Sequence, residues 1–217
     1  ADSAGRAAHL VLKLANAREF GISVATFYLG MDCTMEELGI DDYTVFVMGD
    51  ANPRKQYENR ETDGIYIVNC LNKVIPDSSP AGTCTLFFTI PVFGSDLPDD
   101  LTPEGYKRYK NEIARKYITD YEALTGLSIL PHIEEISIAT PVTFARYLGT
   151  PEGTIYGYKL SGWDNLLSRI SCEKDEYTIP GLNFCGGHAF RGDGYSSAYV
   201  SGDTVAKRVI KRAKGGN

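Results

Sequence analysis

The sequence predicts a mixed α+β protein with a largely antiparallel sheet, one long helix, and a strand, glycine-rich loop and helix at the C-terminus. Three observations support this fold class. Short runs rich in β-branched and aromatic residues follow one another in the first half of the chain, separated by turn signals. Residues 102–126 carry an apolar stripe at helical spacing. A loop with several glycines joins the last apolar run to a final helix.

The predicted strands are short, and most of them lie in the first half of the chain. They cover residues 23–31, 44–49, 64–74, 84–93, 132–141, 153–160 and 182–187. The run at 84–93 is almost wholly apolar, so we expect it inside the sheet rather than at an edge. Pro, Asp, Ser and Gly residues at 76–82 predict the turn that precedes it.

Four segments predict helices, at 6–18, 102–126, 140–149 and 196–213. The clearest is 102–126, because Thr102 suits the N-cap, Pro103 the first helical position and Gly126 the C-terminal stop. Its apolar stripe comprises Tyr106, Tyr109, Ile113, Tyr117, Tyr121 and Leu124. We interpret this stripe as the face that packs on the core rather than as a ligand surface.

The chain has 217 residues and a formal net charge of −6, which argues against a nucleic-acid partner, since such proteins normally carry a basic face. Hydrophobic residues make up 43% of the chain, yet no run of about 20 apolar residues predicts a transmembrane helix. No signal peptide is recognisable. Lys and Arg residues gather at 207–214, which indicates a solvated helix end or, alternatively, peripheral contact with a membrane.

The five cysteines are odd in number and lack the spacing of a metal-binding knuckle. Cys70, Cys84 and Cys185 lie in apolar, strand-like runs, which favours buried free thiols and a reducing, cytoplasmic location. The three histidines are scattered along the chain, so the sequence predicts no metal site.

Residues 182–202 carry the most chemical information, because an apolar run, a glycine-rich loop and a helix start follow one another there. Glycines at 186, 187, 192 and 194 let the backbone turn with positive φ and approach a ligand closely. A helix start offers free N–H groups and a partial positive charge, which suit a phosphate or a ring that gains negative charge. The same spacing also fits a purely structural connection, and neither GxGxxG nor a phosphate-binding GxxxxGK[ST] motif occurs in the chain.

Three stretches resemble signatures of the phytoene desaturase-like FAD-dependent oxidoreductases, which include carotenoid desaturases, carotenoid isomerases and retinol saturase-like enzymes. Residues 181–202 resemble the family's C-terminal strand, glycine-rich loop and helix with a Ser-Gly pair, here Ser201 and Gly202. Residues 139–158 resemble its TP-x-x-F-x-R-Y-x-G-x-P-x-G-x-x-Y-G signature. Residues 77–91 resemble its proline- and glycine-containing turn before an apolar strand.

The resemblance implies that the chain is the C-terminal portion of such an enzyme. Residues 1–171 would form the substrate-side domain, and 172–217 would complete an FAD-binding domain whose N-terminal Rossmann part is absent here. We therefore expect the isolated chain to bind FAD poorly. The missing Rossmann portion is the implied partner.

The resemblance also implies which residues face the flavin. Gly194, Tyr195, Ser196 and Ser197 would stabilise the pyrimidine edge, where reduced flavin gains negative charge. Gly186 and Gly187 would lie along the pyrophosphate and ribityl chain. Gly192 and Asp193 complete the cofactor-binding loop, although Asp193 and Arg191 are as well interpreted as a solvated pair.

The implied reaction is hydride exchange between the flavin and a hydrophobic, isoprenoid- or carotenoid-like substrate. The apolar strands would form the floor of the substrate pocket, although core packing gives the same pattern. Tyr156 could line that pocket, but we favour a core tyrosine with a satisfied hydroxyl. No residue is assigned as a catalytic acid or base, and we interpret His188 as a lone histidine rather than a catalytic one, because acid–base catalysis needs a positioned partner. The alternative function is a free-standing hydrophobic-ligand or interaction domain without redox activity.

Overall fold

The computed structural model describes residues 18–52, 54, 64–98, 101–159, 181–187 and 194–215. The chain divides into two compact units. The first spans Ser23–Gly153 and holds the sheet. The second is made of the chain on either side of it, Ala1–Ile22 together with Thr154–Asn217. The predicted helix at 6–18 lies almost wholly outside the described residues.

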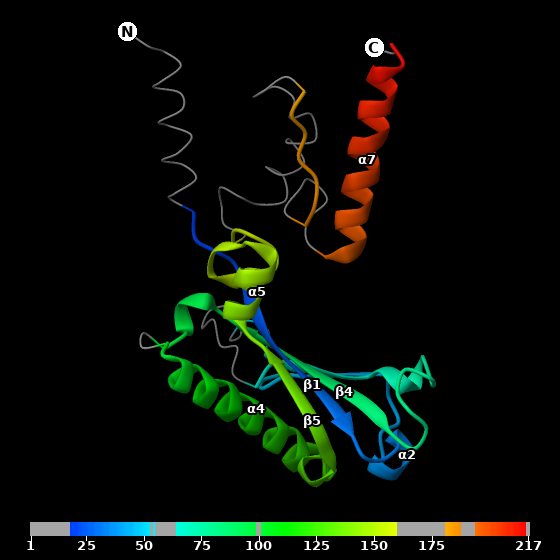
Figure 1. Ribbon diagram of the computed structural model, residues 1–217, viewed down its shortest axis with the longest axis vertical. Coiled ribbons are helices and arrows are strands. Elements are labelled where there is room, and N and C mark those ends of the chain that lie inside the picture. The colour runs from blue at the N-terminus through cyan, green and yellow to red at the C-terminus, as the bar shows by residue number, and fades with distance from the viewer. Residues whose placement is uncertain are drawn as a thin grey trace. The chain divides into compact units, whose positions relative to one another are not determined.

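The first unit contains a five-stranded antiparallel sheet in the order β2-β3-β4-β1-β5 (Figure 1). Its strands are β1 (Ser23–Met31), β2 (Thr44–Val47), β3 (Tyr66–Cys70), β4 (Cys84–Val92) and β5 (Ile133–Ala139). Its helices are α2 (Met35–Leu38), α4 (Pro103–Thr125) and α5 (Pro141–Leu148). The predicted α+β fold with an antiparallel sheet and one long helix is therefore confirmed, and β4 lies at the centre of the sheet as expected.

One face of the sheet forms the core, because its strands alternate between buried and less buried residues. In β1 and β4 the registered pairs Phe27 with Phe88 and Leu29 with Leu86 are at most 1% exposed. Tyr66 and Val68 of β3 add to the same buried layer. This alternation explains why each strand can be short and still specify its register.

Helix α4 covers that buried face. Tyr117 and Tyr121 meet the ring of Tyr66 edge-on, with centroids 5.2 Å and 6.3 Å away. Thr102 caps the helix by accepting a hydrogen bond from the N–H of Gly105, and Gly126 ends it with a φ of 75°. The interpretation of the tyrosine stripe as core packing is confirmed at Tyr117 and Tyr121, which are both buried.

The opposite face of the sheet is only partly covered. Tyr28 of β1 is 49% exposed and Phe46 of β2 is 69% exposed. The rings of Tyr28 and its registered partner Phe87 lie 6.3 Å apart on this face. The sheet therefore has one face that is buried under α4 and one face that carries aromatic residues and is partly exposed to solvent.

The segment that follows α5 departs from the predicted strand at 153–160. Pro151–Gly153 form a 3-10 turn, and the next residues bend until an isolated bridge pairs Tyr158 with Phe20. Positive φ values at Gly153 (65°) and Gly157 (83°) interrupt the extended backbone that a strand needs. The strand predicted at 64–74 is likewise shorter, because a 3-10 turn replaces it after Cys70.

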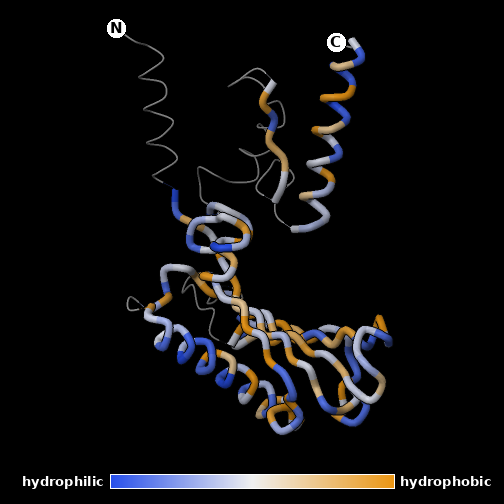
Figure 2. The backbone as a smooth tube through the Cα atoms, in the orientation of Figure 1, coloured by the Kyte–Doolittle hydropathy of each residue, from blue (hydrophilic) through white to orange (hydrophobic). Residues whose placement is uncertain are grey.

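The second unit contains helix α7 (Tyr195–Ala213), which confirms the predicted final helix. Hydrophobic and hydrophilic residues alternate along this helix (Figure 2). The predicted strand at 182–187 is wrong, because the described residues 181–187 form no strand. No described strand offers them a partner, and Gly186 has a φ of 122°, outside the strand region.

A short antiparallel pairing joins the two pieces of chain in this unit. Gly21 donates its N–H to the carbonyl of Gly157 at 2.8 Å, and Ile155 donates to Ile22 at 3.2 Å. The rings of Phe20 and Tyr158 stack with centroids 5.6 Å apart. Gly21 is required for this approach, because a Cβ there would lie 2.8 Å from the Gly157 oxygen.

Candidate functional site

A single serine ties the glycine pair 186–187, here called the glycine turn, to helix α7. The Oγ atom of Ser201 accepts a hydrogen bond from the N–H of Gly186 at 2.8 Å. The same hydroxyl lies 2.9 Å from the carbonyl oxygen of Ala198 and 3.3 Å from that of Gly186, and it donates to one of them. Because Ser201 is fully buried, this tether fixes the turn against the second turn of the helix.

The glycine turn leaves its backbone accessible. Apart from its chain neighbours, no described residue has a heavy atom within 4 Å of the position that a Cβ of Gly186 would occupy. At Gly187, Cδ1 of Tyr156 lies 3.9 Å from the corresponding position. Among the residues that the structure describes, no side chain therefore blocks the approach of a ligand to Gly186.

Helix α7 begins beside this turn at Gly194, which has a φ of 102°. The carbonyl of Gly194 accepts the first helical hydrogen bond, from Ala198 at 3.0 Å. No side chain of the described residues caps the helix start. The N–H groups at the start of a 19-residue helix thus have no intrahelical partner and present the positive end of its dipole. This arrangement favours an anion or a ring that gains negative charge.

Six of the eight predicted cofactor-binding residues lie in the described part of this unit. They are Gly186, Gly187, Gly194, Tyr195, Ser196 and Ser197. The other two, Gly192 and Asp193, lie outside the described residues, as do Arg191 and His188. Ser201 was not among the predicted contacts. The signal that could have found it is the small Ser201–Gly202 pair inside an otherwise amphipathic helix.

Tyr156 is not the buried core tyrosine that we favoured from the sequence. Its side chain is 37% exposed, and its ring lies next to Gly187. The bends at 155–157 replace the expected strand and turn the residue away from a packed core. Tyr156 therefore lies beside the glycine turn, where it can contact a ligand of that turn.

Several exposed residues of this unit are large and hydrophobic. Large hydrophobic residues are exposed both in the segment before the glycine turn and along α7, namely Leu182, Phe184, Tyr195, Tyr199, Val200, Val209 and Ile210. Exposed apolar patches of this kind mark surfaces that bind another molecule or another part of a protein.

The comparisons with known proteins identify no relative: no family model matches the chain, and no curated protein matches it. No helix of the described residues is long and apolar enough to cross a bilayer. The functional argument therefore depends on the chain's own geometry and on the sequence motifs.

Proposed function

We propose that this chain is the substrate-side domain and the C-terminal flavin-closing segment of an FAD-dependent oxidoreductase. The enzyme would be of the phytoene desaturase-like type and would act on a hydrophobic, isoprenoid- or carotenoid-like substrate. The observation that carries the proposal is the glycine turn, held by buried Ser201 beside the start of α7, where no side chain of the described residues forms a cap. The motif resemblance at 139–158 and 181–202 supplies the family.

The described residues fit one edge of FAD. The open space beside Gly186 would accept the pyrophosphate and ribityl chain, since a side chain there would obstruct them. The N–H groups of Tyr195, Ser196 and Ser197 would stabilise the pyrimidine edge of the ring through the helix dipole. When bound, the flavin supplies hydride exchange with the substrate. The protein's part is to hold the ring and favour its reduced, more negative form.

The partly open face of the sheet suits a hydrophobic substrate. Tyr28 and Phe87 form an aromatic pair on that face, and Phe46 extends it towards the β2 edge. Aromatic and aliphatic walls with few polar groups are typical of sites that bind apolar ligands. Hydride exchange at a C–C unit is accompanied by the transfer of a proton, and we assign no residue of this chain as the acid or base for that transfer.

The dinucleotide-binding half is the proposed partner of the apolar surface around α7. Exposed Tyr199 and Ile210 would be buried against it, which would make the flavin site complete. Under this proposal the chain alone would hold one edge of the cofactor, so we expect no tight complex when FAD is titrated into it.

The complete open reading frame that encodes this chain provides the test. We expect the purified product to be yellow and to contain stoichiometric FAD, measured by absorbance after heat release. Ser201→Ala should lower the retained flavin at least about tenfold, because it frees the glycine turn. Thr204→Ala is the matched control, because the Thr204 hydroxyl donates within α7 to the carbonyl of Val200 at 2.8 Å.

A second variant separates loss of cofactor from loss of fold. A Cβ at Gly187 would make an ordinary 3.9 Å contact with Tyr156, so Gly187→Ala should keep the circular dichroism spectrum and yet obstruct the flavin. A colourless product with an intact wild-type sequence would contradict the proposal. Tight, saturable binding of a hydrophobic ligand by that colourless protein would instead support a ligand-binding domain without redox activity.

A further inference from the structure

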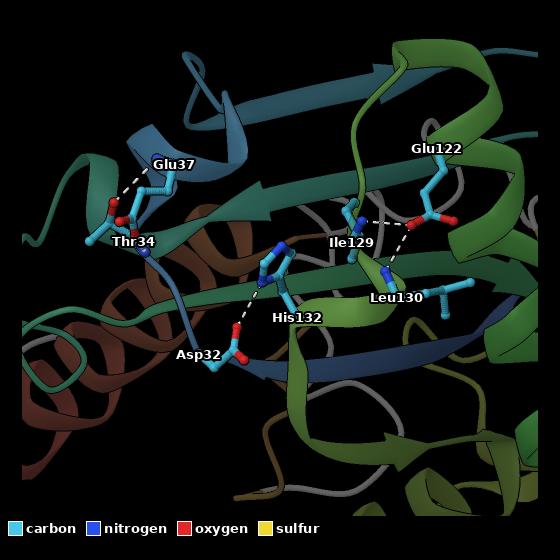
Figure 3. A network of polar contacts seen from close by, with 7 residues as sticks. All are labelled: Asp32, Thr34, Glu37, Glu122, Ile129, Leu130 and His132. Carbon is cyan, nitrogen blue, oxygen red and sulfur yellow. Dashed lines mark hydrogen bonds and ion pairs between the residues drawn. The ribbon is translucent and has the colours of Figure 1, made fainter.

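A β-bulge at one end of the sheet brings Asp32 and His132 side by side. The register between β1 and β5 shifts between Gly30 and Met31, so that Met31 pairs with Ile133. The ladder then continues one step, with the N–H of Asp32 donating to the carbonyl of His132 at 3.0 Å. Beyond the bulge the two side chains point toward one another, and Nδ1 of His132 lies 2.9 Å from Oδ1 of Asp32 (Figure 3).

Cys33 completes a compact group with these two residues. A sulfur, an imidazole nitrogen and a carboxylate oxygen from Cys33, His132 and Asp32 all lie within 4.8 Å of one another. Cys33 is buried, whereas the side chains of His132 and Asp32 are 43% and 54% exposed. The group thus has one fixed ligand atom and two that can adjust from the solvent side.

Hydrogen bonds outside the group hold both segments that carry it. Oε1 of Glu122, on α4, accepts from the N–H groups of Ile129 and Leu130 at 2.6 Å and 2.8 Å, which anchors the turn leading to His132 (Figure 3). On the other side, Thr34 and Glu37 form a reciprocal capping box directly after Cys33. The group is therefore positioned by interactions that its own three side chains do not make.

We propose that Asp32, Cys33 and His132 bind a zinc-type divalent cation, with water in the remaining coordination position. Thiolate, imidazole and carboxylate are the ligands that Zn²⁺ prefers, and three protein ligands with one open position are a known arrangement for it. Tetrahedral zinc places its ligand atoms roughly 3.3–3.7 Å apart, so the exposed carboxylate and imidazole need to separate slightly from their present contact.

The charge around the group favours a cation. The carboxylates of Asp32 and Glu37 lie close enough to the Cys33 sulfur to act on it electrostatically. A bound cation replaces the thiol proton and relieves the repulsion between the thiolate and the two carboxylates. The bound ion would join the end of β1 to the start of β5, two segments that are about 100 residues apart in the sequence.

Cobalt titration of the reduced chain tests the site, because Co²⁺ occupies zinc sites and reports a sulfur ligand by charge-transfer absorption. We expect one Co²⁺ per chain with a thiolate-to-metal band, and its displacement by Zn²⁺. Cys33→Ser should abolish the band, and Asp32→Asn and His132→Asn should each weaken binding at least about tenfold. Cys185→Ser, which removes an exposed cysteine of the second unit, is the matched control and should bind as the wild type does.

Folding of each variant is checked by circular dichroism. Asp32→Asn and His132→Asn replace exposed residues, so they keep the test valid if Cys33→Ser does not fold. A weaker thiolate-to-metal band in His132→Asn than in the wild type would show that His132 and the cysteine bind the same ion. Wild-type affinity in either exposed variant would overturn the proposal, as would cobalt binding without a sulfur band or no binding at all. None of these outcomes depends on flavin, so the proposed function is tested separately.

Discussion

The hydroxyl of Tyr66 on β3 donates a 2.7 Å hydrogen bond to Oδ2 of Asp120 on α4. The Tyr66 ring is completely buried between Phe88 and the tyrosines of α4, while Asp120 lies at the solvent edge. This bond joins the long helix to β3 at the edge of the core. Tyr66→Phe should lower the free energy of unfolding by about 1–2 kcal/mol, measured by urea unfolding at pH 8.

The same contact predicts a pH dependence. Burial and the Asp120 carboxylate raise the pKa of Tyr66 far above its usual value of about 10. The stability that depends on a neutral Tyr66 is therefore fully present below about pH 10 and is lost as the pH rises further, because the phenol of the unfolded chain ionises first. We expect the wild type to lose stability more steeply than Tyr66→Phe between pH 9 and about 11. Tyr147→Phe, at an exposed tyrosine, is the control, and equal slopes for wild type and Tyr66→Phe would contradict the argument.

The two faces of the sheet should respond differently to truncation at neighbouring positions. Phe88 is fully buried under α4, so Phe88→Ala should cost about 3–5 kcal/mol through lost burial and a cavity. Phe87 lies on the other face against Tyr28, and Phe87→Ala should cost about 1 kcal/mol or less. Chemical denaturation of the two variants measures the difference. Similar costs would mean that the aromatic face is also covered in solution.

Much of the fold could be predicted from the sequence, because it depends on residues that are close together in the chain. The strand at 23–31 and the helix after Thr102 appear at the expected residues, because alternation and capping are properties of a few adjacent residues. The predicted strand at 153–160 failed because a strand also depends on φ at Gly153 and Gly157 and on a pairing partner. Such long-range requirements are not visible in a short window of sequence.

The candidate sites also depend on long-range contacts that a short window of sequence does not reveal. The glycines at 186, 187 and 194 were recognisable from their spacing, whereas the tether from Ser201 crosses 15 residues and depends on how the turn meets the helix. Asp32 and His132 are further apart still, and only the β1–β5 register makes them neighbours. Scattered histidines in a sequence therefore do not exclude a cluster in the fold.

The cysteines should differ in reactivity according to burial. Cys185 is exposed, whereas Cys33, Cys70 and Cys84 are buried, and burial with nearby carboxylates also raises the pKa of Cys33. A brief iodoacetamide pulse at pH 8 in the presence of a chelator should modify Cys185 at least about tenfold faster than the three buried thiols. Peptide mapping by mass spectrometry measures each site, and the denatured chain gives the reference rates. Comparable labelling of Cys33 in the native chain would show that the end of β1 opens readily.

Two glycines of the 139–158 signature have nearly the same backbone but different surroundings, and this difference predicts their tolerance to substitution. Gly149 and Gly153 have φ values of 68° and 65°. Apart from its chain neighbours, no described residue comes within 4 Å of a Cβ built at Gly149, so Gly149→Ala should cost only the strain of a left-handed conformation, about 1 kcal/mol. A Cβ at Gly153 would overlap the carbonyl group of Pro141, and the Gly153 carbonyl also accepts a 2.6 Å hydrogen bond from buried Ser23. Gly153→Ala must therefore displace both β1 and α5 and should cost about 3 kcal/mol or more. Thermal and urea unfolding of the matched pair measures the two costs, and equal values would show that the turn can move away from Pro141 without penalty.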